Sequence, residues 1–328
     1  MGTKTHLFSA ILSAPGTGPQ AAAAWLSALC SDPDAIPHRL PWLRSLLAWL
    51  VARVRAPALA QRCASLDAET LRWAEIEQQA RDLGRMLGPH YAVRPVLRYA
   101  GPDAAQAAKD TRPGERVILL PLEPHVSGPT TISPIRGALR ALDGTRTEVA
   151  RVSGYPDAPL YVEALAETLR EALVGLPEPA YEVLFCARGL PSAGGPYPAQ
   201  VRATLDALLA RVPLARPHHL AFTRAPGLLA GPGPTVDEVV KERGRAGLRC
   251  LVLVPLGFTS DHVETRVELD QELAALARSA GIAHIRRAPT VAVRPTFLRA
   301  LQAQVHQAED EAGWDIPWRE ALQTVGRK

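Results

Sequence analysis

Residues 249–272 read RCLVLVPLGFTSDHVETRVELDQE, and the rest of the chain can be interpreted from this stretch. Residues 250–256 form a continuous run rich in Leu and Val, which is typical of a parallel strand buried on both faces. Gly257 permits a sharp exit from that strand, and Asp261 stands three residues before Glu264, the spacing of a capping box at a helix start. The stretch therefore predicts a strand, a turn and a helix of an α/β fold.

Carboxylates recur along the predicted helix at four-residue intervals. Glu264, Glu268 and Glu272 would lie along one side of it. Because open α/β sheets bind ligands beyond the carboxyl ends of their strands, these acids could lead cations or protons toward a crevice. The alternative is that Glu264 caps the helix and the other two face water, since helices are commonly acidic near their N-termini.

The composition indicates a folded protein of more than one domain. The 328 residues exceed one typical hydrophobic core, and 47% of them are hydrophobic. The formal net charge is +4, but the basic residues form no block. Nucleic acid is therefore not an expected partner.

The cysteines indicate a reducing compartment. Cys30, Cys63, Cys186 and Cys250 are scattered, and no two form a CxxC pair. This pattern argues against a zinc ribbon or an iron–sulfur cluster and fits the cytoplasm. The N-terminus shows no convincing signal peptide, so a cytoplasmic protein without a tightly bound cofactor is expected.

Strand-like and helix-like segments alternate along the chain, which predicts βαβ units and parallel sheets. The predicted strands are residues 6–12, 91–99, 117–122, 181–186, 219–223, 250–256 and 283–286. The predicted helices are residues 19–30, 40–60, 69–86, 103–109, 135–142, 160–173, 200–212, 236–243, a segment ending near 280, and 296–312. Residues 145–157 are predicted to be an irregular connection.

A faint internal duplication predicts two similar halves. Leu120-Pro121-Leu122 and Val254-Pro255-Leu256 both end buried strands, and loops containing Ser and Thr follow both. We therefore expect two Rossmann-like domains with parallel sheets, residues 1–150 and 151–295, with their strand ends facing a central cleft. A C-terminal helix within residues 296–328 is expected to pack back across them.

Residues 40–60 are apolar and aromatic but contain Arg44, Arg53 and Arg55. A membrane-spanning helix needs about 20 predominantly apolar residues, so this interrupted segment is not expected to cross a bilayer. It could be a patch in peripheral contact with a membrane, a lid over a pocket, or an ordinary amphipathic core helix.

Five short motifs occur in order along the chain: SDPDAIPHRLPWLRSLL at residues 31–47, LPLEPHVSGPTT at 120–131, FCARGLP at 185–191, PYP at 196–198 and GFTSDHVETRVELD at 257–270. Together they resemble the motifs of the ferrochelatases, which insert ferrous iron into a porphyrin in haem synthesis. The last motif is long and specific. The others are individually weak but collinear.

The resemblance implies a porphyrin held in the cleft between two Rossmann-like halves, with a His on one wall and a catalytic Glu, here Glu264, on the other. It implies Fe2+ as the substrate metal. The sequence does not distinguish a monomer from a homodimer. It places Glu264, Glu268, Asp270 and Glu272 on an acidic metal path, with Asp261 and His262 at its head. It further implies ligand contacts by Glu123, Ser127, Thr130 and Tyr197.

The main departure from the family pattern is that Arg188 replaces the motif His. A guanidinium is always protonated and offers no lone pair, so it can neither accept a proton nor bind iron. The loop in which the family has Tyr, Gln and Tyr contains Glu123, His125 and Val126 instead. Two further family segments are altered, at residues 11–15 and 223–227.

Two explanations compete. In the first, the protein is a ferrochelatase-like lyase in which His125 or His262 replaces the missing imidazole and Arg188 orients a propionate. In the second, a divergent paralogue binds or transforms another small anionic ligand, with Arg188 as anchor and Glu264 as base, either as a biosynthetic enzyme or as a tetrapyrrole-binding protein. Arg188 could also be structural and paired with a carboxylate, His125 a loop residue, and His262 a neighbour of a helix cap.

Overall fold

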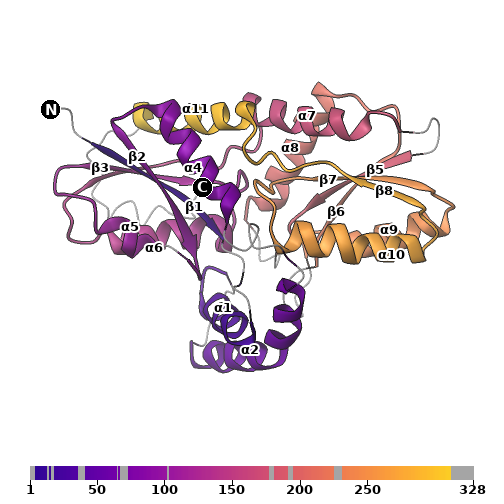
Figure 1. Ribbon diagram of the computed structural model, residues 1–328, viewed down its shortest axis with the longest axis horizontal. Helices are drawn as coiled ribbons and strands as arrows, with labels where there is room; N and C mark the ends of the chain where they lie inside the picture. The colour runs from indigo at the N-terminus through magenta and orange to yellow at the C-terminus, as the bar shows by residue number, and fades with distance from the viewer. Residues whose placement is uncertain are drawn as a thin grey trace. The chain divides into compact units, whose positions relative to one another are not determined.

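The chain divides into two compact units in the computed structural model. Unit 1 consists of Met1–Tyr155 and Leu298–Lys328, and unit 2 of Pro156–Phe297. The structure describes residues 4–12, 15, 18–35, 41–64, 66, 73–101, 103–176, 181–190, 195–224 and 231–311, with only the backbone of 41–44. Each unit is built around its own parallel sheet (Figure 1).

Within the described residues, the sheet of unit 1 has four parallel strands in the order β2-β1-β3-β4. The strands are β1 (Thr5–Leu12), β2 (Tyr91–Arg98), β3 (Arg116–Pro121) and β4 (Glu148–Arg151). The prediction that residues 145–157 are irregular is wrong, because β4 pairs with β3 there. Its two buried residues, Val149 and Ala150, are too few to give a strand periodicity.

The sheet of unit 2 repeats this arrangement, with four parallel strands in the order β6-β5-β7-β8 in the described part of the chain. They are β5 (Tyr181–Ala187), β6 (His218–Phe222), β7 (Cys250–Pro255) and β8 (His284–Arg287). β1 and β5 occupy equivalent positions, as do β3 and β7. The predicted α/β fold with two similar parallel sheets is confirmed.

The duplicated prolines end equivalent strands. Pro121 closes β3 and Pro255 closes β7, where a proline removes a backbone donor without interrupting the ladder. The next residue restores the pairing in both units: the Leu122 N–H donates to the Ala10 carbonyl at 2.9 Å, and the Leu256 N–H donates to the Cys186 carbonyl at 2.7 Å. The two strand ends therefore share one local design.

Helices connect the strands and cover the sheets. Those of unit 1 are α1 (Pro19–Ser31), α2 (Pro41–Cys63), α4 (Ala74–Leu87), α5 (Ala104–Ala108), η1 (Gly128–Ile132) and α6 (Ser133–Ala141). Those of unit 2 are α7 (Pro159–Leu173), α8 (Tyr197–Arg211), α9 (Val236–Arg245), η2 (Glu264–Leu273) and α10 (Ala274–Ser279). α11 (Pro295–Glu311) begins in unit 2, and its remainder belongs to unit 1. The predicted domain boundaries and the packing of the C-terminal helix across both domains stay predictions.

α1 and α2 lie side by side in unit 1 (Figure 1). α2 packs its small residues Ala52, Ala56 and Ala60 against Ala22 and Leu26 of α1. Large apolar side chains of α2 are instead exposed: Leu46, Leu47, Trp49, Leu50 and Val54. This distribution does not fit an ordinary core helix. In the described part of the chain, no helix is long and apolar enough to cross a membrane.

A buried aspartate fastens the end of α1 to the sheet of unit 1. The Asp32 carboxylate accepts hydrogen bonds from Arg98 Nη2 at 2.7 Å, from Tyr99 Oη at 2.9 Å and from Ser133 Oγ. Nearby, Asp34 pairs with Arg136, and its carbonyl oxygen lies so close to Gly128 that any Cβ there would clash. The segment that follows α1 is therefore locked onto η1 and α6.

Replacing Asp32 with Ala should destabilise the protein by about 3 kcal/mol, because Arg98 and Ser133 lose a charged acceptor in a mostly buried site. Asp110→Ala is the control, since Asp110 is 53% exposed in its pair with Arg94 and should cost less than about 1 kcal/mol. Urea unfolding measures both values. Equal losses would show that the Asp32 network is not a structural anchor.

The same network predicts a pH dependence. Burial alone would raise the pKa of Asp32, but the hydrogen bonds from Ser133, the Asp34 amide, Arg98 and Tyr99 outweigh it and hold the pKa below 3.8. The ionised carboxylate therefore stabilises the fold above pH 3.8, and this contribution is lost as the pH falls through the lower folded-state pKa. The stability difference between the natural chain and Asp32→Ala should narrow over that acidic range.

Candidate functional site

The strand order of unit 2 places its functional loops side by side. From β5 the chain crosses to β6 on one side, whereas from β7 it crosses to β8 on the other. Ligands of open parallel sheets bind where the connections diverge in this way, beyond the carboxyl ends of the strands. Arg188 follows β5 directly, and residues 256–264 follow β7. The paired ends of β5 and β7 therefore bring these loops together.

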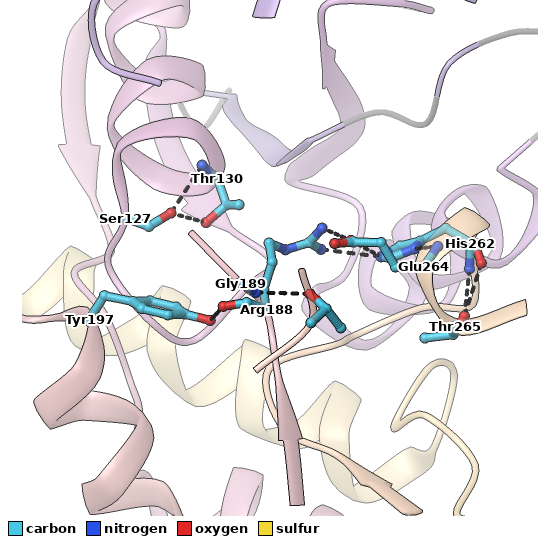
Figure 2. Close-up of polar contacts among 9 residues, drawn as sticks. Ser127, Thr130, Arg188, Gly189, Tyr197, His262, Glu264 and Thr265 are labelled. Atoms are coloured by element: carbon cyan, nitrogen blue, oxygen red, sulfur yellow. Dashed lines mark hydrogen bonds and ion pairs between the residues drawn. The ribbon is translucent and has the colours of Figure 1, made fainter. Parts of the chain in front are cut away.

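Arg188 and Glu264 form an ion pair, between guanidinium Nη1 and carboxylate Oε2 (Figure 2). Their side chains are 9% and 22% exposed. The guanidinium carbon also lies 5.1 Å from the centre of the Phe258 ring, within the range of a cation–π contact. The carboxylate that pairs with Arg188 is thus the proposed catalytic Glu264 itself.

The backbone around Arg188 is held from two sides. Tyr197 Oη donates to the Arg188 carbonyl at 2.9 Å, and the Gly189 N–H donates to Thr223 Oγ1 at 2.8 Å (Figure 2). The Tyr197 hydroxyl thus positions the Arg188 main chain, and its predicted contact with ligand stays a prediction. Thr223 lies in the altered family segment 223–227, and its positioning role was not predicted from the sequence.

His262 lies beside the ion pair, and its Nε2 is 3.7 Å from Glu264 Oε2. The Glu264 backbone N–H donates to Nδ1 at 3.1 Å, and Arg188 Nη2 lies 3.2 Å from Nε2. Burial, followed by the charges of Arg188 and Arg287, lowers the pKa of His262 well below 6.5. The ring is therefore neutral at pH 7, and this environment disfavours it as a proton acceptor.

The start of the helix differs from the predicted capping box. Asp261 does not cap the helix with Glu264; instead its carboxylate pairs with Arg266 at 2.7 Å and with Arg287 at 3.2 Å. The first turn is closed locally by Thr265 Oγ1, which accepts from the His262 N–H at 2.9 Å. The ion pairs with two arginines outweigh the capping interaction of Asp261 with backbone amides.

Arg287 binds a second acid of the predicted metal path. Its Nε lies 2.5 Å from Asp270 Oδ1, and its Nη2 lies 2.9 Å from Asp270 Oδ2. Burial lowers the pKa of Arg287, but its hydrogen bonds and ion pairs with Asp270 and Asp261 outweigh this and raise that pKa above its usual range. Two carboxylates of the predicted path are therefore engaged by Arg287.

The three glutamates lie on η2, a π-helix of ten residues. π-helices are rare and commonly occur at functional sites. Glu264 and Glu268 are partly buried, and Glu272 is exposed, so exposure increases along the series toward solvent. In the described part of the chain, no three His, Cys, Asp or Glu side chains form a group able to hold a metal ion.

The predicted site residues of unit 1 follow β3. Glu123 and His125 are buried, and burial lowers the pKa of His125 to about 3, so its imidazole is neutral at pH 7. Ser127 Oγ accepts from the Thr130 N–H at 3.2 Å and lies 2.6 Å from Thr130 Oγ1 (Figure 2). Ser127 and Thr130 thus cap η1, and their predicted contact with ligand stays a prediction.

Known proteins of similar sequence are ferrochelatases. The family model for ferrochelatase matches residues 12–309. The ferrochelatase of Geotalea uraniireducens (strain Rf4) is 33% identical over 299 residues, covering 88% of this chain and 93% of that protein. The ferrochelatase of Phenylobacterium zucineum (strain HLK1) is 34% identical over 312 residues, covering 90% and 89% respectively.

Solved structures of similar fold are chelatase-like. SirB from Bacillus subtilis with Fe3+ has a TM-score of 0.56 at 17% identity, covering 74% of this chain and 93% of that one. CbiX, described as the terminal enzyme for siroheme biosynthesis in denitrifying bacteria, has a TM-score of 0.50 at 16% identity, covering 74% and 95%. The family and the fold support metal insertion into a tetrapyrrole. On the match across residues 12–309 and these relatives, the chain belongs to the ferrochelatase family.

Proposed function

We propose that this protein inserts Fe2+ into a porphyrin in haem biosynthesis, acting as a ferrochelatase-type lyase. The observation that supports this most is Glu264 at the diverging ends of β5 and β7, in a chain of the ferrochelatase family. Metal insertion requires two pyrrole protons to leave the porphyrin. A carboxylate can accept a proton and can also bind a divalent metal. Glu264 is the residue we assign to this role.

The other charged residues divide into two groups. Glu268 and Glu272 continue from Glu264 toward solvent along η2 and are proposed to guide the incoming metal. Asp261 and Asp270 are better explained as partners of Arg287, which fixes the base of this helix. The metal path we propose is therefore shorter than the sequence predicted.

Arg188 takes over a binding role in place of the family imidazole. A guanidinium can pair with a propionate through two parallel hydrogen bonds, so we assign Arg188 to an anionic group of the tetrapyrrole. His125 and His262 both remain candidates to replace the missing imidazole, and burial lowers the pKa of each, so both rings are neutral at pH 7.

A second candidate function, binding of an anionic ligand without metal insertion, follows from the presence of Arg188 beside Glu264. A permanent cation beside Glu264 also suits a protein that binds another small anionic ligand, or a tetrapyrrole without inserting metal. Anaerobic insertion assays distinguish the two functions. Turnover supports the chelatase, whereas porphyrin binding without turnover supports the second candidate.

Glu264→Gln should lower the rate of metal insertion by about 100-fold to 10,000-fold, because the amide cannot accept the pyrrole protons. The assay follows absorbance during anaerobic addition of Fe2+ or Zn2+ to protoporphyrin and coproporphyrin. Glu242→Gln is the control, since Glu242 is 74% exposed on α9 and should retain the natural rate. A Glu264→Gln protein as active as this control would remove Glu264 from the mechanism.

We further propose that α2 makes peripheral contact with a membrane. Its exposed face presents Leu46, Trp49, Leu50 and Val54 together with Arg53, and its sequence contains no acidic residue. An apolar face bordered by arginines suits the surface of an anionic bilayer. The absence of acids removes a source of repulsion from anionic headgroups.

The triple change Trp49→Ser, Leu50→Ser and Val54→Ser should weaken binding to vesicles containing phosphatidylglycerol by at least about tenfold, because it removes three large apolar contacts. Vesicle sedimentation measures the binding. The control changes Leu160 and Val174 to Ser, both exposed apolar residues of unit 2, and should bind like the natural chain. Equal sedimentation of the two variants would rule out α2 as the contact surface.

A further inference from the structure

The Arg188–Glu264 ion pair places a positive charge on the carboxylate that metal insertion needs. Arg188 Nη1 contacts Glu264 Oε2, and both side chains are largely shielded from water. A divalent metal approaching Glu264 must displace this guanidinium and meets its charge. Because the pair lies mostly out of solvent, water screens this repulsion weakly. The free protein is thus poorly suited to bind metal at Glu264.

An anionic tetrapyrrole would compete for the same guanidinium. Carboxylates bind arginine through paired, charge-assisted hydrogen bonds, so a propionate can replace Glu264 as the partner of Arg188. Two neighbouring carboxylates, those of Asp261 and Asp270, are already paired with Arg287. Exchange between Glu264 and a ligand carboxylate is therefore the rearrangement that this site favours.

The exchange does not require the backbone to move. The Arg188 carbonyl and the Gly189 N–H stay bound to Tyr197 and Thr223, so only the side chain needs to turn. Release of Arg188 would leave the Glu264 carboxylate free at the N-terminus of η2. There it could accept a proton or bind the metal.

We infer that Arg188 couples the two substrates: it pairs with Glu264 in the free protein and transfers to a tetrapyrrole carboxylate on binding, so that the tetrapyrrole binds before the metal. This inference rests on the proposed function and defines the order of its two binding steps. It makes Arg188 a residue that controls access of metal to Glu264.

The test measures two equilibria without turnover, using full-length protein. Zn2+ alone is titrated by competition with a chromophoric chelator, and coproporphyrin alone is titrated by its Soret band. Arg188→Gln should bind Zn2+ about tenfold more tightly than the natural chain, a value within the usual range for coupled sites. The double variant Arg188→Gln, Glu264→Gln should lose this gain. Glu264→Gln should bind coproporphyrin more tightly, because Arg188 no longer has the charge of Glu264 to pair with.

Two control variants distinguish the effect of losing the Arg188 charge from the effect of misfolding. Arg188→Lys keeps the positive charge and should keep the affinity for Zn2+ low. Arg224→Gln makes the same neutralising change at a side chain that is 79% exposed and should leave both affinities unchanged. Urea unfolding confirms that each variant is folded.

Zn2+ affinities of the natural chain and Arg188→Gln that agree within twofold would overturn the inference, even if the natural chain inserts metal. Unchanged coproporphyrin binding by Glu264→Gln would also overturn it. If both shifts occur but the natural chain inserts no metal, the exchange is supported and the proposed chelatase function fails.

Discussion

The site in unit 2 depends on the ion pair between Arg188 and Glu264, and the order of the strands in the sheet brings these two residues together. β5 and β7 are adjacent and parallel, so the residues that follow them emerge at the same edge. Arg188 follows one strand, and Glu264 begins the helix after the other. Two opposite charges in a largely buried position must pair, because leaving either of them alone would be costly. The fold therefore determines that Arg188 and Glu264 meet.

A second group of ion pairs supports the first. Arg287, at the end of β8, joins Asp261 before η2 to Asp270 within it. This arrangement holds the first turns of η2 against the sheet, and the charges of both arginines act on His262. Arg188 and Arg287 both contact residues 261–270. The position of Glu264 therefore depends on the ion pairs of both arginines.

The parts of this structure that were predictable from the sequence are those with strong local patterns. The Leu- and Val-rich run of β7, the repeated proline at the ends of β3 and β7, and the turn at Gly257 each have a local cause. Gly257 adopts φ of 83°, which a residue with a side chain rarely does. β4 was missed because a short edge strand of four residues is determined by its pairing with β3.

The candidate site was predictable in its residues but not in its contacts. Glu264, Arg188 and His262 lie in recognisable motifs, and the structure brings these three together. The role of Arg287 was not predictable, because β8 gives no sign that Arg287 reaches Asp261 and Asp270 from a neighbouring strand. Nor was the π-helical form of η2, since a four-residue spacing of acids fits an ordinary α-helix equally well.

The way that Arg188 is held explains how its chemistry can differ without disturbing the scaffold. Tyr197 and Thr223 bind main-chain atoms of residues 188 and 189, and these bonds do not require any particular side chain at 188. β5 and its pairing with β7 likewise use the backbone. An imidazole and a guanidinium can therefore both be presented from the same strand end. Replacing the imidazole by a guanidinium changes the charge beside Glu264. That charge in turn sets the proposed order in which the site binds the anionic tetrapyrrole and the metal cation.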